Sequence, residues 1–288
     1  MKPTVYFTRE ITSEKVVELM ERVGVELPGR VAVKFHSGEK GNQNFLGPDM
    51  WRAAVERVHG TAVECNTAYD GSRNTTERHI ETMHDHGWSD AFTVDIMDSE
   101  GPDLELPVRN GKRIHKNLVG RHLANYDSLL VLSHFKGHPM GGYGGALKQL
   151  SIGIASSAGK VYIHGAGDMD AFWTSDHDSF LESMADAASS VVDFFGGRAL
   201  YINVLANLSV DCDCCAVAED PCMQNIGIAA SCDPVAIDQA CIDLVTASDD
   251  PGKEHFLERV NSRNGIHTIE AAAALGIGSR EYELVRID

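Results

Sequence analysis

Short apolar runs alternate with helical stretches along this chain of 288 residues, and this alternation constrains the fold more than any other feature. Residues 4–8 have the composition of a strand, residues 13–23 have helical periodicity with Ser13 as the expected N-cap, and residues 31–35 again have the composition of a strand. Two strands with a helix between them at this spacing are typical of a mostly parallel sheet covered by helices. We therefore expect an α/β fold with helices on both faces of a mostly parallel sheet.

The same pattern continues along the rest of the chain, and Asn110-Gly111 predicts a hairpin turn. We expect two α/β lobes, residues 1–154 and residues 155–288, with a cysteine-rich segment in the second; a single domain is the alternative. Further strands are predicted at residues 61–65, 92–97, 128–133, 199–205, 227–230 and 282–287, and further helices at 48–58, 75–86, 178–195, 234–245, 254–261 and 268–275.

Charge and composition exclude several classes of protein. The formal net charge of -17 makes nonspecific nucleic-acid binding unfavourable, because phosphate contacts need clustered Lys and Arg. No stretch reaches the roughly 20 apolar residues that a spanning helix needs, so no membrane interaction is expected. The number of cysteines, 7, is odd, four of them lie in one segment, and the first residues do not have the form of an export signal. We expect a cytoplasmic protein with free or metal-bound thiols.

The cysteine-rich segment is the strongest single indication of a site. Cys212, Cys214, Cys215 and Cys222 lie within 11 residues of one another in the sequence. A bound cation would neutralise the mutual repulsion of thiolates placed this close. Their spacing matches neither paired zinc knuckles nor a ferredoxin run, so an iron-sulfur cluster and zinc both stay open as cofactors. Adjacent Cys214 and Cys215 cannot easily both face one ion. The alternatives are redox chemistry of the thiols, with a redox partner protein, and a chance grouping of small apolar residues.

A second polar segment, residues 134–148, directly follows the strand predicted at 128–133. It contains 4 glycines within 5 residues, which let the backbone approach a ligand closely. A helix beginning near Gly145 is expected to direct free N–H groups at an anion. The alternative is a tight turn with solvated histidines. The residues assigned to a ligand here are His134, Lys136, His138, Gly141, Gly142, Gly144, Gly145 and Lys148.

Polar side chains also follow two earlier strands, those at residues 31–35 and 61–65. Because the carboxyl ends of parallel strands meet at one edge of a sheet, these segments can form one pocket for a small anionic ligand with the glycine-rich segment. Ordinary exposed side chains are the alternative. The residues assigned to the pocket are Lys34, His36, Glu39, Asn66, Arg73 and, from the following helix, His79.

Several of these segments together resemble the family called domain of unknown function 362, whose members are commonly described as iron-sulfur centre proteins. The resemblance runs over residues 31–42, 66–73 with His79, 137–159, 211–215, 233–239 and 276–283. Many members carry a ferredoxin-type insertion after the segment that resembles residues 153–160. This chain has no cysteine between Lys160 and Asp211, so the clusters of that insertion are not implied. Only Cys212, Cys214 and Cys215 remain, with Cys222 as the candidate fourth ligand.

The glycine-rich segment is also distantly similar to the lactate racemase family, whose enzymes use a nickel-pincer nucleotide joined to a lysine and flanked by histidines. The resemblance implies Lys148 as the anchor and His138 and His164 as acid and base, acting on a small hydroxy or carboxylic acid. Three hypotheses follow. The first is a metal- or iron-sulfur-binding protein with a separate anion pocket, the second is a racemase- or isomerase-like enzyme, and the third is a non-catalytic binder of an anionic ligand.

Overall fold

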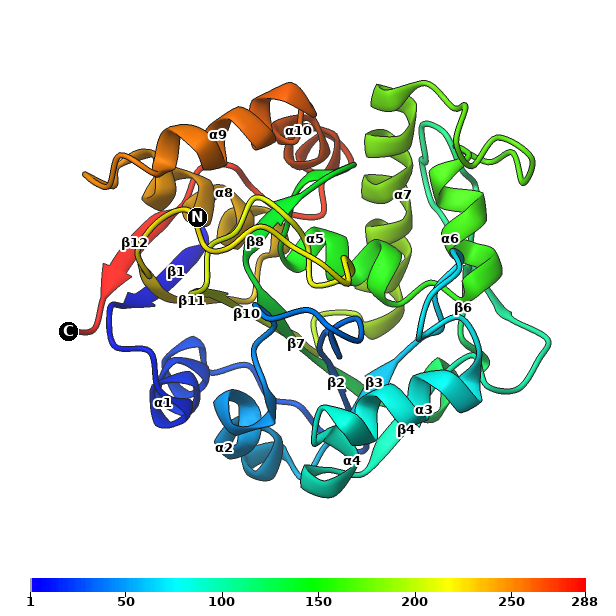
Figure 1. Ribbon diagram of the computed structural model, residues 1–288, viewed down its shortest axis with the longest axis horizontal. Coiled ribbons are helices and arrows are strands. Elements are labelled where there is room, and N and C mark those ends of the chain that lie inside the picture. Colours follow the sequence, from blue (N-terminus) through cyan, green and yellow to red (C-terminus); the bar gives the residue numbers. More distant parts are fainter. Residues whose placement is uncertain (1) are drawn as a thin grey trace.

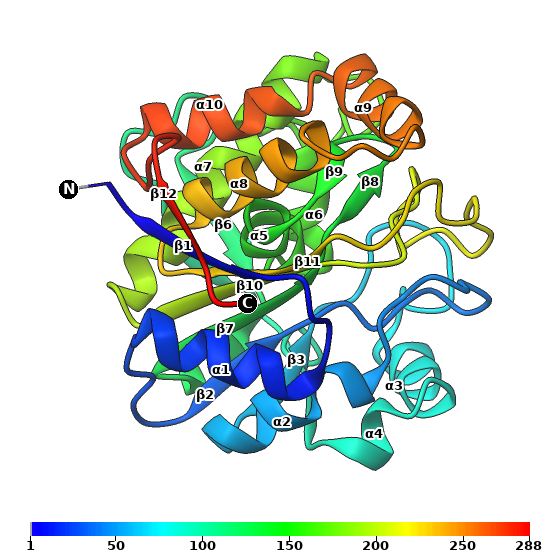
Figure 2. The same cartoon turned by 90° about the vertical axis from the view of Figure 1, so that its left-hand side faces the viewer.

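The computed structural model describes residues 2–288 and has the predicted α/β fold, a mostly parallel sheet between two layers of helices (Figures 1 and 2). The strand order is β12-β1-β11-β10-β7-β2-β3-β4. Only β11 runs antiparallel to both of its neighbours, β1 and β10. The strands are β1 (Thr4–Thr8), β2 (Val31–Lys34), β3 (Thr61–Glu64), β4 (Val94–Ile96), β7 (Ser128–His134), β10 (Ala199–Leu205), β11 (Gly227–Ser231) and β12 (Glu283–Arg286).

The helices fall into two groups, one on each face of the sheet, and Figure 2 shows the two layers with the sheet between them. The first group is α1 (Ser13–Val23), α2 (Pro48–Val58), α3 (Thr76–Asp85) and α4 (Trp88–Ala91). The second group is α5 (Ala146–Lys148), α6 (Ser157–His164), α7 (His177–Phe195), α8 (Pro234–Thr246), α9 (Lys253–Ser262) and α10 (Ile266–Ala274).

Strand β7 shows why a continuous apolar run forms a central strand here. Leu129 and Val131 are buried in the core under α7 and α8, whereas Leu130 and Leu132 are buried in the core under α1 and α2. Successive side chains of a strand point to opposite faces, and both faces of this sheet are covered. An apolar residue is therefore favoured at every position of the strand.

Both halves of the chain contribute to this one sheet. Strands β10 and β11, which follow residue 154, lie between β1 and β7, which precede it. The predicted division at residue 154 therefore does not coincide with a break in the sheet. No helix among residues 2–288 combines the length and the apolar character that crossing a bilayer would require.

Local details differ from the sequence-based expectations. The N-cap of α1 is Thr12, whose side chain accepts a hydrogen bond from the Lys15 amide, so the prediction of Ser13 was wrong. The predicted hairpin pairs β5 (Leu104–Pro107) with β6 (Lys116–Val119), and Asn110 adopts a φ of 58° in its loop. Other elements were not predicted, among them the hairpin of β8 (Lys136–His138) and β9 (Gly142–Gly144), helices α4 and α6, and the π-helical form of Gln149–Gly153. A short 3-10 helix spans Arg121–Asn125.

Candidate functional site

A cavity of about 350 Å³ lies beside the carboxyl ends of β2 and β3 and extends along the β8–β9 hairpin and the π-helix. Three polar segments that are far apart in the sequence meet here, because neighbouring parallel strands end at the same edge of the sheet. The residues assigned to a site from the sequence that line the cavity are Lys34, His36, Arg73, Lys136, His138, Gly144, Gly145, Lys148, His164 and Cys214.

Two buried lysines of the cavity wall are fixed by carboxylates. The Nζ atom of Lys34 donates to Glu64 and to the Gln149 side-chain oxygen, each at 2.9 Å. The Nζ atom of Lys136 lies 3.1 Å from Oδ2 of Asp213. Burial raises the pKa of Glu64, but the positive charge of Lys34 and other neighbouring groups outweighs this effect and lowers that pKa to about 2. These lysines therefore present their positive charge from a fixed position.

Arg73 is held in the same manner by Glu39. Its Nε atom lies 3.1 Å from Oε2 of Glu39, and its terminal nitrogen donates to the Tyr69 hydroxyl at 3.0 Å. Glu39 also accepts hydrogen bonds from the backbone N–H and the hydroxyl of Ser72. Glu39 is therefore a support for Arg73 and does not itself line the cavity.

The cavity carries more positive than negative charge. Its cationic side chains are those of Lys34, Arg73, Lys136, Lys148 and Lys160. Among residues 2–288, Lys148 and Lys160 have no carboxylate within 4.0 Å, and Lys160 Nζ donates instead to the Ala155 carbonyl at 2.6 Å. Three of the five cations thus pair with three carboxylates, Glu64, Glu39 and Asp213, which leaves an excess of 5 − 3 = 2 positive charges. A small anion is the ligand that such a cavity favours.

Two cavity histidines are held in opposite tautomers. His138 Nδ1 accepts hydrogen bonds from the N–H groups of Met140 and Gly141, at 3.1 and 2.8 Å, so the proton of the neutral ring lies on Nε2. His164 Nδ1 lies 2.7 Å from the Lys160 carbonyl oxygen, which only accepts, so the proton lies on Nδ1 and Nε2 is an acceptor.

The two rings are neutral near pH 7. Burial lowers the pKa of His138 to about 4, and the positive charge of Lys148 adds to that effect. Burial likewise lowers the pKa of His164 to about 4. A third cavity histidine, His36, accepts the Gly38 N–H at Nδ1, and burial together with Arg73 holds its pKa well below the ordinary value.

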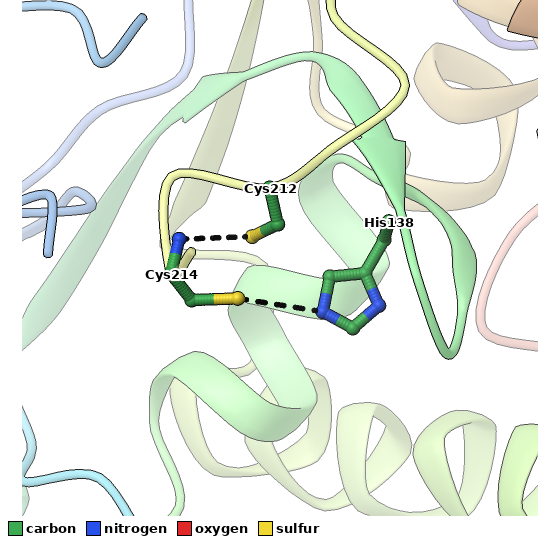
Figure 3. A group of neighbouring side chains, drawn as sticks. All are labelled: His138, Cys212 and Cys214. Atoms are coloured by element: carbon green, nitrogen blue, oxygen red, sulfur yellow. Dashed lines mark hydrogen bonds between the residues drawn. The ribbon is translucent and has the colours of Figure 1, made fainter. Parts of the chain in front are cut away.

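His138 also belongs to a group of metal-ligand type with Cys212 and Cys214 (Figure 3). One ligand atom from each residue lies within 4.8 Å of the others. His138 Nε2 is 3.8 Å from Cys214 Sγ, and the Cys214 N–H lies 3.5 Å from Cys212 Sγ. Burial and the neighbouring Cys214 raise the pKa of the Cys212 thiol to about 11. The three residues could hold a metal ion, and two sulfurs with one imidazole are donors typical of zinc sites.

The cysteine segment and the anion pocket, which the sequence predicted as separate sites, adjoin one another. Cys214 belongs to the metal-ligand group and also lines the cavity. The reason lies at Gly137 in β8, whose N–H donates to the Ser209 carbonyl at 2.8 Å. A Cβ atom on Gly137 would lie 2.3 Å from the Val210 carbonyl oxygen. A residue without a side chain lets the hairpin pack directly against the backbone that leads into the cysteine segment.

Two of the four predicted cysteine ligands lie outside this group. Cys215 follows Cys214 directly, and its carbonyl oxygen accepts a hydrogen bond from the Asn42 side chain at 2.8 Å. Cys222 turns its sulfur toward the Leu208 carbonyl oxygen, 3.2 Å away. The structure therefore brings Cys212 and Cys214 to His138 but does not bring Cys222 to them.

Other residues assigned to the ligand from the sequence support the cavity from behind. His134 lies between the Asp213 carboxylate, at 2.9 Å, and the Ala206 carbonyl oxygen, at 2.6 Å. His79 contacts the Ser37 hydroxyl at 3.0 Å and Asn66 at 3.3 Å, and burial lowers the pKa of its ring to about 3. Gly141 ends the turn of the β8–β9 hairpin, and Gly142 begins β9 with a φ of +78°.

The helix that begins after Gly145 faces an anion of the protein itself. The carboxylate of Asp238 in α8 accepts the N–H groups of Ala146 and Leu147, at 2.8 and 3.0 Å. It also accepts the Tyr143 hydroxyl and the Asn203 side-chain amide. The expected role of these N–H groups in ligand binding was therefore wrong, because Asp238 already satisfies them. Their function is to fix the start of the segment that carries Lys148.

Sequence reasoning missed several residues of the cavity wall. Glu64 is a charged residue at the end of an apolar strand, a signal that was available. Lys160 lies in a helix that was not predicted, and Phe172 and Trp173 lie in an acidic stretch without periodicity, so no pattern indicated them. The missed lining residues include Glu64, Cys65, Tyr69, Gln149, Ile152, Lys160, Phe172 and Trp173.

Comparisons with known proteins identify a family and two distant structural neighbours. The sequence matches, over residues 31–243, the family described as Domain of unknown function (DUF362). No curated protein matches the chain. A structural-genomics target protein from Thermotoga maritima shares 14% identity, with 93% of this chain and 59% of that chain covered and a TM-score of 0.45.

The second neighbour is the lactate racemase apoprotein from Thermoanaerobacterium thermosaccharolyticum. It shares 14% identity, with 72% of this chain and 51% of that chain covered and a TM-score of 0.41. The present chain thus spans less than two thirds of the length of either solved chain. Likenesses this distant assign no activity.

Proposed function

The chain belongs to the family described as domain of unknown function 362, and we propose that it binds a small organic anion in its cation-lined cavity beside a thiophilic metal ion. The observation that carries the proposal is the excess of two positive charges in the cavity wall. Lys148 and Lys160 contribute this excess, because neither contacts a carboxylate of residues 2–288. Lys160 is buried and Lys148 is half-buried, so a cation without a counter-ion is unfavourable at both positions, and a bound anion would supply that counter-ion.

An unsatisfied donor supports the same ligand. Gln149 lines the cavity, and its side-chain oxygen accepts a hydrogen bond from Nζ of Lys34. Its buried Nε2 atom has no hydrogen-bond partner among residues 2–288. Buried polar groups are almost always hydrogen-bonded in native proteins. A carboxylate oxygen in the cavity would give this amide an acceptor.

The residues of the metal-ligand group fit one ion better than an iron-sulfur cluster. Clusters take four cysteine ligands, whereas this group has Cys212 and Cys214 with His138. Three protein ligands of this kind leave one position of a tetrahedral ion open, as in zinc sites that act on a substrate. His138 would bind as a neutral imidazole through Nε2, which requires its ring proton to move to Nδ1 and the Met140 and Gly141 N–H groups to give up that acceptor. Two thiolates and a divalent ion are neutral together, so the positive excess of the cavity persists.

Anion binding is tested by calorimetric titration with succinate, phosphate and acetate at low ionic strength, using the wild type and Lys148→Met. The matched control is Lys116→Met, because Lys116 forms an exposed ion pair with Glu105 on the hairpin of β5 and β6. We expect Lys148→Met to weaken binding of the dianions by about tenfold or more, which corresponds to about 1.4 kcal/mol. Equal affinities in both variants, or no binding of any probe, would contradict the proposal.

Metal binding is tested by equilibrium dialysis against Co²⁺ and by the absorption of its thiolate complex. We expect one Co²⁺ per chain, lost in Cys212→Ser and Cys214→Ser and retained in Cys222→Ser. Zn²⁺ should displace it. Retention of Co²⁺ in the Cys214→Ser variant together with loss in Cys222→Ser would show that other ligands hold the ion. Brown protein with broad visible absorption after anaerobic purification would favour a cluster instead.

A second candidate function is an isomerase- or racemase-like enzyme acting on a small hydroxy or carboxylic acid. The specific observation in its favour is the pair of opposite tautomers, because His138 presents an N–H donor and His164 presents an unprotonated nitrogen to the same cavity. An acid and a base on one substrate are what proton transfer in two directions needs. Lys148 lies in the same wall, and its Nζ atom has no hydrogen-bond or ion-pair partner among residues 2–288, so it is free to anchor a substrate or a nickel-pincer-type cofactor.

This candidate has its own readouts. Chiral chromatography of single enantiomers of 2-hydroxy acids should show interconversion that His164→Gln abolishes. If Lys148 anchors a cofactor, whole-protein mass spectrometry of the native protein should show a covalent adduct. Proteolytic peptides should then place that adduct on the peptide that contains Lys148. If neither interconversion nor an adduct is observed, this candidate is excluded and anion binding remains the function.

A further inference from the structure

The cavity has two chemically different ends. Its inner end is lined by Lys34, Arg73 and Lys136, whose exposed fractions are 1%, 3% and 3%. Its outer end is lined by Trp173, which is 75% exposed, and by the partly buried Phe172. A ligand that enters the cavity therefore passes an aromatic edge before it reaches the buried cations.

The aromatic edge continues into the wall as a stack of rings. Phe172 lies 4.7 Å from the ring of His164, which in turn lies 4.7 Å from the ring of Phe180 in α7. Trp173 meets Phe172 edge to face at 4.4 Å. His164 is thus packed between two rings, and Trp173 extends this arrangement to the mouth of the cavity. Flat faces placed in such a series are suited to contact another flat group.

Trp173 has no role in the core. Trp51 and Trp88, the other two tryptophans, are 2% and 1% exposed and belong to the core under α1 and α2. Trp173 lies instead in the segment of residues 165–176 between α6 and α7, which is anchored at Ser175 by a hydrogen bond to the His164 carbonyl oxygen. An indole that is held at the mouth of a pocket and packs against no core has its largest free face available to a ligand.

We propose that the ligand is an amphipathic organic anion, whose carboxylate lies among the buried cations and whose flat apolar group lies against Trp173 and Phe172. The proposal rests on the anion-binding function stated above and adds the chemical class of the ligand. His164 refines that class, because its Nε2 atom is an acceptor without a partner among residues 2–288 and suits a ligand hydroxyl. A hydroxy acid with an aromatic substituent combines all three features.

The volume of the cavity is compatible with such a ligand. Pockets for small molecules enclose about 300–1,000 Å³, and this one, at about 350 Å³, lies at the small end of that range. One ring and one carboxylate fit this volume, whereas a nucleotide is a larger ligand with several phosphates. Trp173 and Phe172 would then determine specificity and would not take part in chemistry.

The test uses two probes that share a head group, 3-phenyllactate and lactate, titrated into the wild type, Trp173→Ala, Trp173→Phe and Lys148→Met. Binding is followed by calorimetry in all four proteins. In the two that keep Trp173, the wild type and Lys148→Met, it is also followed by acrylamide quenching of tryptophan emission, because Trp173 is the exposed tryptophan. In the wild type we expect phenyllactate to bind about tenfold or more tighter than lactate. Trp173→Ala should bring the ratio close to one without changing the affinity for lactate, and Trp173→Phe should restore part of it.

The outcomes separate this inference from the function on which it rests. Lys148→Met should weaken both probes by the same factor, because the two probes share the carboxylate. Equal binding of phenyllactate and lactate by the wild type, with both weakened in Lys148→Met, would overturn the inference and leave anion binding intact. An unchanged ratio in Trp173→Ala would also overturn it. Absence of binding by both probes would overturn the inference and the anion-binding function together.

Discussion

The Nζ atom of Lys34 lies 2.9 Å from Oε2 of Glu64, and both side chains are almost completely buried, at 1% and 4% exposed. Strands β2 and β3 are parallel neighbours, and Lys34, the last residue of β2, lies opposite Val63, which directly precedes Glu64. The pair connects the sheet to the π-helix in the cavity wall, because Lys34 also donates a hydrogen bond to Gln149 of that helix. Three of our predictions concern residues that hold this wall of the cavity in place.

Replacing Glu64 with Gln should destabilise the protein and change its response to acid. The variant leaves Lys34 without its carboxylate, which costs about 3–5 kcal/mol for a buried pair. The pKa of Glu64 is lowered from 4.5 to about 2 on folding, so its stabilising contribution is complete above pH 4.5 and is lost as the pH falls toward 2. Urea unfolding of the wild type and the variant should differ most at neutral pH and converge in this acidic range.

The control for this prediction is Glu105→Gln, which removes the exposed partner of Lys116. An exposed pair contributes about 0–1 kcal/mol, so this variant should unfold close to the wild type at every pH. A difference between wild type and Glu64→Gln that stays constant from pH 7 to pH 2 would contradict the assignment of a lowered pKa to Glu64.

Replacing Gly153 with Ala should displace Lys34. A Cβ atom on Gly153 would lie 2.6 Å from the Gln149 side-chain oxygen and 2.9 Å from Cε of Lys34. Overpacking of this kind costs about 1–3 kcal/mol, and here it also moves a cation of the cavity, so succinate should bind more weakly. The matched variant is Gly144→Ala, whose Cβ would have its nearest atom, Cε of Lys136, at 3.5 Å. If both variants keep wild-type affinity, the position of Lys34 does not matter for the ligand.

Replacing Asp238 with Ala should loosen the segment that carries Lys148. The carboxylate accepts two backbone N–H groups, the Tyr143 hydroxyl and the Asn203 amide, and all four donors would lose their acceptor. Each buried donor left unsatisfied costs about 1–3 kcal/mol, so the thermal midpoint should fall by many degrees. Asp243→Ala, which removes an exposed acceptor of the Tyr282 hydroxyl from the same helix, is the comparison. Similar midpoints for the two variants would contradict the role given to Asp238.

The fold was predictable because its signals are local. The bounds of β1, α2 and β10 match the predicted ranges, since each segment is a short apolar run or a periodic stretch with a clear beginning. The β8–β9 hairpin was not predictable in this way. It is rich in glycine, has no apolar period, and is held by contacts such as that of Gly137 with the Ser209 carbonyl, which comes from a segment far along the chain.

The candidate site was predictable in its parts but not in its assembly. Lys34, Lys136 and Lys148 could be selected because polar residues follow apolar strands, and parallel strands end at one edge. The sequence does not show that Asp213 lies between His134 and Lys136, that Asp238 occupies the helix start near Gly145, or that Cys214 reaches the cavity. These relationships depend on packing between elements that are distant in the sequence.

The central claim is that the metal-ligand group and the cation-lined cavity form one site, in which Cys214 belongs to both. The most direct test is the visible spectrum of the Co²⁺-loaded protein, titrated with succinate. A dianion bound beside His138 and Cys214 alters the surroundings of the ion, so we predict a saturable change in the Co²⁺ absorption bands that Lys148→Met shifts to about tenfold higher succinate concentration. A Co²⁺ spectrum that stays unchanged while calorimetry shows succinate saturating the protein would contradict the claim.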